Sequence, residues 1–127
     1  MGGAGDGLPA HGRLRAREDF DRVFREGRAV VTPLMVVRAV RSGVGDARVG
    51  FAVSRHLGGA VVRNRLRRRW REVVRRGPPI RPGWDVVVVA RSGSRTAGWA
   101  GLVQAWQAAL GRGGLVAVPR QDVGPGR

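Results

Sequence analysis

The spacing of apolar residues predicts three helices, over residues 18–26, 60–76 and 96–110. Within each range apolar side chains recur three and four positions apart, which places them on one helix face. These faces consist of Phe20, Val23 and Phe24; of Val62, Leu66, Trp70 and Val73; and of Trp99, Leu102, Val103, Trp106 and Leu110. Gly27 and Gly77 are typical helix stops, and Ser94 or Thr96 would cap the third helix.

Strand patterns between the helices predict a small sheet. Residues 33–41 and 48–54 have strand composition, and the turn-forming residues 42–46 join them, which predicts an antiparallel hairpin. Residues 84–90 contain four consecutive valines and predict a buried central strand. The element order is therefore α-β-β-α-β-α, an α+β fold with a small, mostly antiparallel sheet and packed helices.

Composition predicts the domain limits. Residues 1–12 contain five glycines and predict a flexible N-terminal leader, while residues 13–111 form a single domain. Residues 112–127 contain four glycines and two prolines and predict a flexible tail, apart from the apolar residues 115–118. The chain lacks the apolar run of a signal peptide or a membrane span, so we expect no membrane association and a cytoplasmic location.

The net charge of the chain gives the strongest indication of the kind of partner it binds. Its 127 residues include 24 basic residues, all of them arginine, and 9 acidic ones, for a net charge of +15. The absence of cysteine excludes disulfides and thiol nucleophiles, and the absence of lysine excludes Schiff-base chemistry. So basic a domain favours a polyanionic partner.

The charge is concentrated in the second predicted helix. Residues 63–76 hold eight arginines and one acid, Glu72. Helical geometry places Arg63, Arg67 and Arg71 on one flank of the apolar stripe, Arg65 and Arg76 on the other, Arg68 and Arg75 opposite it, and Arg69 near the stripe itself. A solvated face is the alternative interpretation, but such faces usually mix both signs. The pattern therefore favours a surface that binds phosphates, for which the guanidinium fork is suited.

Other candidate chemistry is weaker. His11 and His56 are the only histidines, and nothing in the pattern brings them together as an acid–base pair. The acids of residues 18–26 are typical of helix-dipole and ion-pair interactions rather than of a metal site. Helical spacing assigns Trp70, Trp99 and Trp106 to the core, whereas Trp84 suits core or rim equally. We predict no catalytic residue and no metal ligand in this chain.

A specific motif joins the second strand pattern to the arginine-rich helix. Residues 49–55 read Val-Gly-Phe-Ala-Val-Ser-Arg, and Arg63–Asn64–Arg65 follows within the helix. This order resembles the protein subunit of bacterial ribonuclease P, whose signature is a Val-Gly-x-x-Val-Ser strand before an Arg-Asn-Arg helix. Residues 13–27 and 85–90 resemble the family's N-terminal segment and late strand. The resemblance covers about residues 11–110.

The resemblance implies a function in removing the 5′ leader of precursor tRNA. In that family the RNA subunit and the Mg²⁺ it holds perform the hydrolysis, while the protein stabilises the RNA and binds the leader. The implied partners are the ribonuclease P RNA and precursor tRNA, with no protein partner. The implied fold includes a left-handed β-α-β crossover, whereas general rules would predict a right-handed one.

The resemblance also implies site residues. The RNA-binding set is Arg55, Arg63, Asn64, Arg65, Arg67, Arg68 and Arg71. The leader-binding set is Arg13, Arg15, Arg17, Phe20 and Phe24, although helical spacing alone would make the two phenylalanines core residues.

Three departures from the family pattern stand out. Residues 35–37 are Met-Val-Val where many relatives have a leader-facing aromatic, His56 follows Arg55 where a second basic residue is common, and Gly59 replaces a frequent polar residue.

Two alternatives from other classes stay open at this point. A general basic RNA-binding or ribosome-associated protein would have the same charge, and a protein-only nuclease would need a catalytic constellation that the sequence does not display.

Overall fold

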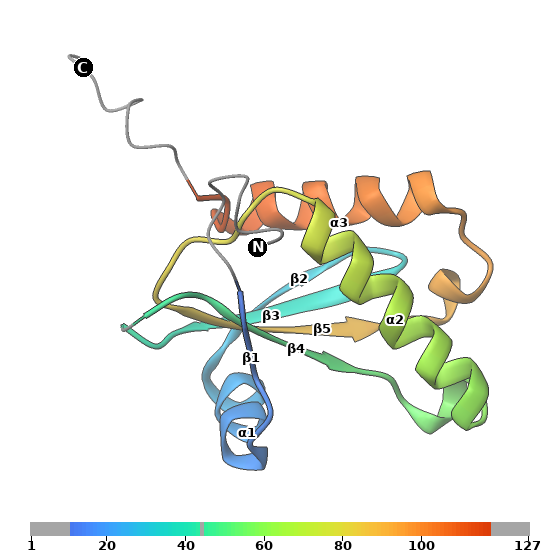
Figure 1. The fold of residues 1–127 in the computed structure, drawn as a ribbon, viewed down its shortest axis with the longest axis horizontal. Coiled ribbons are helices and arrows are strands. Elements are labelled where there is room, and N and C mark those ends of the chain that lie inside the picture. Colours follow the sequence, from blue (N-terminus) through green and yellow to red (C-terminus); the bar gives the residue numbers. More distant parts are fainter. Residues whose placement is uncertain (1–10, 44, 118–127) are drawn as a thin grey trace, which may run out of the picture.

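The computed structural model describes residues 11–43 and 45–117 and has a mixed α+β fold, which confirms the predicted class (Figure 1). The helices are α1 (Arg17–Glu26), α2 (Ala60–Arg76) and α3 (Trp99–Gly113), with short 3₁₀ helices η2 (Arg55–Leu57) and η3 (Ser92–Arg95). The strands are β1 (Gly12–Arg13), β2 (Arg28–Val31), β3 (Met35–Arg41), β4 (Arg48–Ala52) and β5 (Trp84–Ala90). The pattern missed β1 and β2, because strands of two and four residues carry too little alternation.

The five strands form one sheet in the order β1-β4-β5-β3-β2. The predicted hairpin of β3 and β4 is wrong, because β5 lies between them, antiparallel to β3 and parallel to β4. The valines of β5 explain this arrangement, since Val86 and Val88 face one side and the buried Val87 faces the other. Only a central position buries both faces of a strand. α2 joins the parallel neighbours β4 and β5, and the left-handed sense of this crossover stays a prediction.

The helices cover the two faces of the sheet unequally. α2 and α3 pack on one face and α1 packs on the other (Figure 1). The larger core lies on the α2–α3 side and includes the fully buried Trp70, Trp106 and Met35. A side chain at Gly77 would collide with the indole of Trp106, so the chain turns closely over that ring at the end of α2. None of the described helices is long and apolar enough to cross a membrane.

The structure corrects two details near α3. Trp99 is 41% exposed rather than part of the core. α3 begins after Gly98 with no side-chain cap, because the Ser94 hydroxyl instead donates to the Arg91 carbonyl oxygen within η3.

The packed part of the chain is longer than the predicted range of 13–111. The backbone N–H of Gly12 donates to the Ala47 carbonyl oxygen, which starts β1. At the other end Leu115 is buried and Val116 forms an isolated β-bridge with Ile80. Residues 1–10 and 118–127, which hold most of the predicted leader and tail, lie outside the described residues.

Candidate nucleic-acid interface

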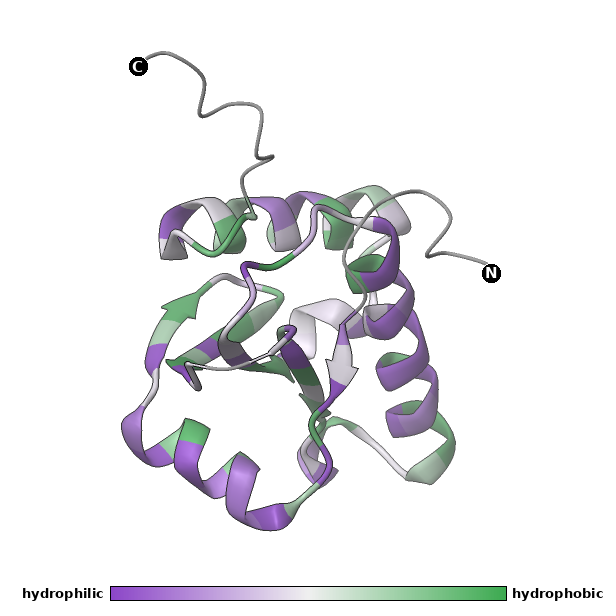
Figure 2. Ribbon diagram, turned by 60° about the vertical axis from the view of Figure 1, so that its left-hand side comes forward, coloured by the Kyte–Doolittle hydropathy of each residue, from purple (hydrophilic) through white to green (hydrophobic). Residues whose placement is uncertain are grey.

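α2 presents its arginines because only one narrow stripe of the helix is apolar. Leu66, Trp70, Val73 and Val74 are buried against the sheet and α3, and Val62 is half-buried beside them. The predicted stripe is therefore confirmed. Apart from the exposed Val61 in its first turn, the outward side of α2 is strongly hydrophilic (Figure 2).

On the flank of α2 that faces β4, the arginines are oriented without being neutralised. Nε of Arg63 donates to the Gly58 carbonyl oxygen at 3.2 Å, and Nη1 of Arg67 donates to Oδ1 of Asn64 at 2.8 Å. The guanidinium of Arg71 lies over the Phe51 ring, 5.6 Å from its centroid. A carbonyl, an amide and a ring fix these side chains while leaving their full positive charge.

On the flank that faces α3, two arginines are partly used within the fold. Arg69 donates to the carbonyl oxygens of Ala97 at 2.8 Å and Ser94 at 3.4 Å, which confirms that it extends out from the apolar stripe. Arg76 pairs with Glu72 at 3.1 Å, as Arg75 does at 2.8 Å.

Glu72 is the only acid on α2. The hydrogen bond from Arg75 lowers the pKa of its carboxyl, with a further contribution from the charge of Arg76. Only the C-terminal turn of α2 is therefore partly neutralised.

Three predicted RNA-binding arginines are exposed and have no side-chain partner among residues 11–43 and 45–117. They are Arg65 and Arg68 on α2 and Arg55 in η2, directly before that helix. Together with Arg63, Asn64, Arg67 and Arg71 they form one continuous region of η2 and α2, which we call the α2 surface.

The predicted leader-binding phenylalanines lie on the opposite face of the sheet and differ from each other. The ring of Phe20 packs onto β4 beside Leu14 and Val87, so closely that a side chain at Gly50 would overlap it. Phe24, one turn later, is 41% exposed. Phe20 therefore serves mainly in packing, whereas the ring of Phe24 is accessible.

Arg38 is a residue of this face that the sequence analysis missed. Its guanidinium lies 5.7 Å from the centroid of the Phe24 ring, and its Nη2 donates to the Phe24 carbonyl oxygen at 3.0 Å. Its Nε is buried and has no hydrogen-bond partner in the described part of the chain. Strand alternation was the available signal, because the buried neighbours Val37 and Ala39 point to the other face.

The remaining leader-binding candidates line the start of the domain. Arg13 and Arg15 are exposed on either side of the buried Leu14, and Arg17 is exposed at the first residue of α1. Of the three residues that replace the family's aromatic, only Val36 lies on the α1 face, since Met35 and Val37 are buried in the larger core.

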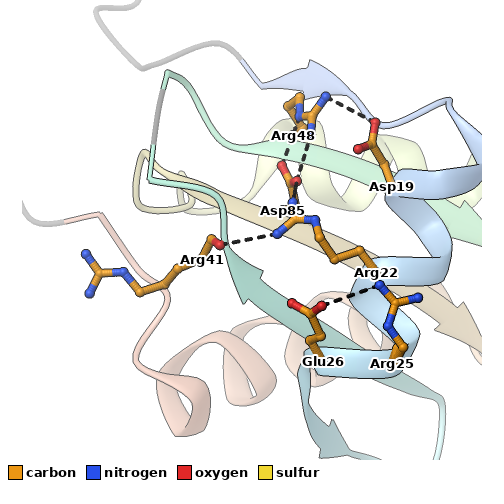
Figure 3. Close-up of polar contacts among 7 residues, drawn as sticks. All are labelled: Asp19, Arg22, Arg25, Glu26, Arg41, Arg48 and Asp85. Atoms are coloured by element: carbon orange, nitrogen blue, oxygen red, sulfur yellow. Dashed lines mark hydrogen bonds and ion pairs between the residues drawn. The ribbon is translucent and has the colours of Figure 1, made fainter.

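An ion-pair network around a buried carboxylate holds α1 against the sheet (Figure 3). Asp85 is completely buried and accepts from Nε and Nη2 of Arg48 at 2.9 and 2.7 Å and from Nη2 of Arg22 at 2.5 Å. Arg48 also pairs with Asp19 at 3.4 Å, and Arg22 donates to the Arg41 carbonyl oxygen at 3.4 Å. The hydrogen bonds from Arg48 to Asp85 raise the pKa of Arg48. The network joins α1, β4 and β5.

The histidines are not brought together as a catalytic pair. Nε2 of His11 accepts from the backbone N–H of Ile80 at 3.1 Å, and burial lowers the pKa of this histidine. His56 lies exposed in η2, where its backbone N–H donates to Oγ of Ser54. Within the described residues no three His, Asp or Glu side chains gather as a metal-binding cluster.

Comparison with known proteins matches residues 8–113 to the ribonuclease P family. The ribonuclease P protein component of Streptomyces avermitilis is 45% identical over 116 residues, covering 83% of this chain and 94% of the relative. That of Roseiflexus castenholzii is 49% identical over 81 residues, covering 63% of this chain and 66% of the relative. The solved structure of the RNase P protein from Thermotoga maritima superposes with a TM-score of 0.70 at 32% identity, covering 79% of this chain and 96% of that one. This chain belongs to the ribonuclease P protein family.

Proposed function

We propose that the α2 surface binds the catalytic RNA of ribonuclease P and that the α1 face of the sheet receives the single-stranded 5′ leader of precursor tRNA. As a ribonuclease P protein component, the chain is a subunit of an endoribonuclease and acts in tRNA processing in association with ribonuclease P RNA. The proposal assigns each partner to a face of the molecule. Its main support is the set of exposed, uncompensated arginines on α2.

The electrostatics of α2 support the assignment of the RNA subunit to this helix. The eight arginines of residues 63–76, with only one glutamate among them, repel one another at i, i+4 spacing, which destabilises an isolated helix. Phosphate groups of a folded RNA would relieve this repulsion and accept bidentate hydrogen bonds from guanidinium groups. Arg65 and Arg68 are the strongest candidates, because no side chain among the described residues competes for them.

The α1 face has the features of a single-strand site. Proteins bind single-stranded nucleic acid by stacking bases on aromatic rings beside a basic groove. The exposed Phe24 ring supplies such a platform, and the guanidinium of Arg38 lies beside it, 5.7 Å from the ring centroid. Arg13, Arg15 and Arg17 would extend the positive rim along the leader.

We further propose that the protein contributes binding and positioning and leaves hydrolysis to the RNA. In this scheme the Mg²⁺ ions are held by the RNA subunit, and the arginines of the protein lower the repulsion between RNA phosphates that those ions must otherwise screen. The protein would therefore matter most at low Mg²⁺. We place this activity in the cytoplasm, where bacterial precursor tRNA is made.

Reconstitution with the cognate RNA tests both halves of the proposal. We expect the protein to stimulate cleavage of precursor tRNA at low Mg²⁺, and the stimulation to increase with leader length. Phe24→Ala and Arg38→Ala should remove the advantage of a long leader while leaving the affinity for the RNA subunit unchanged. Arg25→Ala, which changes an exposed arginine of the same helix, is the matched control.

The outcomes are separable. No stimulation at any Mg²⁺ concentration would refute the subunit function, and stimulation that is independent of leader length would refute the leader site. Equal competition by an unrelated structured RNA at physiological salt would instead indicate a general RNA-binding protein.

A further inference from the structure

Trp99 differs from the other large aromatic residues on its side of the sheet. Trp70 and Trp106 are 1% and 0% exposed and fill the core, whereas Trp99, the first residue of α3, is 41% exposed. An exposed tryptophan leaves a large apolar ring in water. Single exposed apolar residues are common, so the surroundings of the ring decide what it can do.

The surroundings of Trp99 are basic. The guanidinium of Arg76 lies over the ring, 5.5 Å from its centroid, and is itself held by Glu72 at 3.1 Å. Arg95, four residues earlier in η3, is exposed. Arg65 and Arg69 lie on the same flank of α2 as Arg76, because they are spaced by four and seven residues, and Arg69 reaches the Ala97 carbonyl oxygen two residues before the ring.

We propose that Trp99 is a stacking contact for an unpaired base of the ribonuclease P RNA, so that the RNA-binding surface continues from α2 across to the first turn of α3. A base on the exposed part of the indole would lie beside Arg76, and the exposed Arg95, four residues before the ring, could donate to a flanking phosphate. The inference rests on the proposed function of α2 and adds a residue that works by stacking rather than by charge.

RNA is the occupant that this chemistry favours. Every base has a π-face, and a tryptophan beside arginines can bind both the base and the backbone of one strand. The surrounding charge would repel a basic protein surface. The contacts from Arg76 and the position at the start of a helix also limit the freedom of the ring before binding, which lowers the entropy cost of the contact.

The salt dependence of RNA binding tests the proposal with two variants at one position. Trp99→Leu should weaken binding of the cognate RNA at least about fivefold, since a stacked base contributes this much or more. The slope of log affinity against log salt should stay unchanged, because no phosphate contact is lost. Trp99→Phe should restore most of the affinity because it keeps an aromatic face.

Acrylamide quenching of tryptophan fluorescence provides a second readout on the unmodified protein. The part of the quenching that disappears in Trp99→Phe belongs to Trp99. We expect bound RNA to reduce this part in the unmodified protein. For the affinity measurement, the matched control is Val31→Ala, which also shortens an exposed apolar side chain. Val31 is 50% exposed and pairs with Val36 on the strand face away from α3, so its loss should leave RNA affinity unchanged.

Unchanged affinity in Trp99→Leu, or quenching of Trp99 that RNA does not reduce, would overturn the inference. The same affinity measurement distinguishes a failure of the Trp99 contact from a failure of the proposed function of α2. If Arg68→Ala weakens binding and flattens the salt slope while Trp99→Leu does neither, the α2 surface stands and the stacking contact fails. If neither variant has an effect, both fail.

Discussion

Two groups of arginines in this protein are used in opposite ways. Arg22 and Arg48 converge on the buried Asp85 and join α1 to the sheet (Figure 3). On the α2 surface, by contrast, Arg65 and Arg68 are exposed and meet no carboxylate in the described part of the molecule. The same side chain therefore builds the fold in one region and leaves its charge available in the other, and the difference is the presence of an acid within reach.

The energetic reason lies in the burial of the carboxylate. Asp85 has no contact with water, so its charge must be balanced by hydrogen-bonded cations. Arg22 and Arg48 keep 29% and 39% of their side-chain surface exposed, so each also retains some hydration. Within the described fold, only solvent balances Arg65 and Arg68 of the α2 surface. A phosphate from outside would take the place that Asp85 occupies in the network.

Removal of the buried carboxylate should have the largest effect. Asp85→Asn keeps the shape of the side chain but leaves Arg22 without a carboxylate and Arg48 with only Asp19, so we expect a loss of about 3 kcal/mol in the free energy of unfolding. Urea denaturation measures this loss. Asp21→Asn, which changes an exposed acid on α1, is the control and should shift stability by no more than about 0.5 kcal/mol.

The same variant also tests whether the two groups of arginines are independent. At a temperature where Asp85→Asn remains folded, its affinity for the RNA subunit should match that of the unmodified protein. Weakened RNA binding by the folded variant would contradict the division of roles.

Loss of an unpaired arginine of the α2 surface should lower RNA affinity and leave stability nearly unchanged. Arg65→Ala and Arg68→Ala should each lower RNA affinity about tenfold at physiological salt. Each should also flatten the salt dependence by roughly 0.9 units of slope, because one phosphate contact is lost. Their stability should change by no more than about 0.5 kcal/mol, since neither side chain has a partner in the described fold. A normal slope would exclude the residue from the interface; Arg25→Ala serves as the control.

The smallest effect is expected at Glu72, which pairs with two arginines as Asp85 does, but on the surface of α2. Glu72→Gln would release Arg75 and Arg76, and we expect about a twofold gain in RNA affinity with a slightly steeper salt slope. A loss of RNA affinity would instead show that the carboxylate is needed to orient the two arginines.

The pH dependence of stability gives an independent measurement of this pair. Because pairing lowers the pKa of Glu72 below its usual 4.5, its stabilising contribution is present above that value and disappears as the pH falls through the lowered pKa. The melting temperatures of Glu72→Gln and the unmodified protein should therefore converge in acid. A difference that persists there would mean that Glu72 acts through something other than its charge.

The sequence by itself determined the local features of this protein. Helix α2 and strand β5 begin and end at the predicted residues, because periodicity, a Gly-Pro stop and a valine run are local signals. The distribution of arginines around α2 also followed from helical geometry alone. The charge concentrated in residues 63–76 and the resemblance of three blocks, at residues 13–27, 49–72 and 85–90, together indicated an RNA-binding ribonuclease P subunit.

Only the tertiary structure decided which distant residues meet. The turn at residues 42–46 favoured a hairpin, but the gain from burying both faces of β5 placed that strand between β3 and β4. Helical spacing put Trp99 in the core, yet what packs against a helix decides whether its apolar positions are covered, and among the described residues Leu102 is buried while Trp99 stays 41% exposed. Asp85 likewise acquired its partners from α1 and β4, and Arg38 acquired its partner from α1, all of them distant in the sequence. Burial and charge pairing depend on contacts between segments far apart in sequence, which no local pattern specifies.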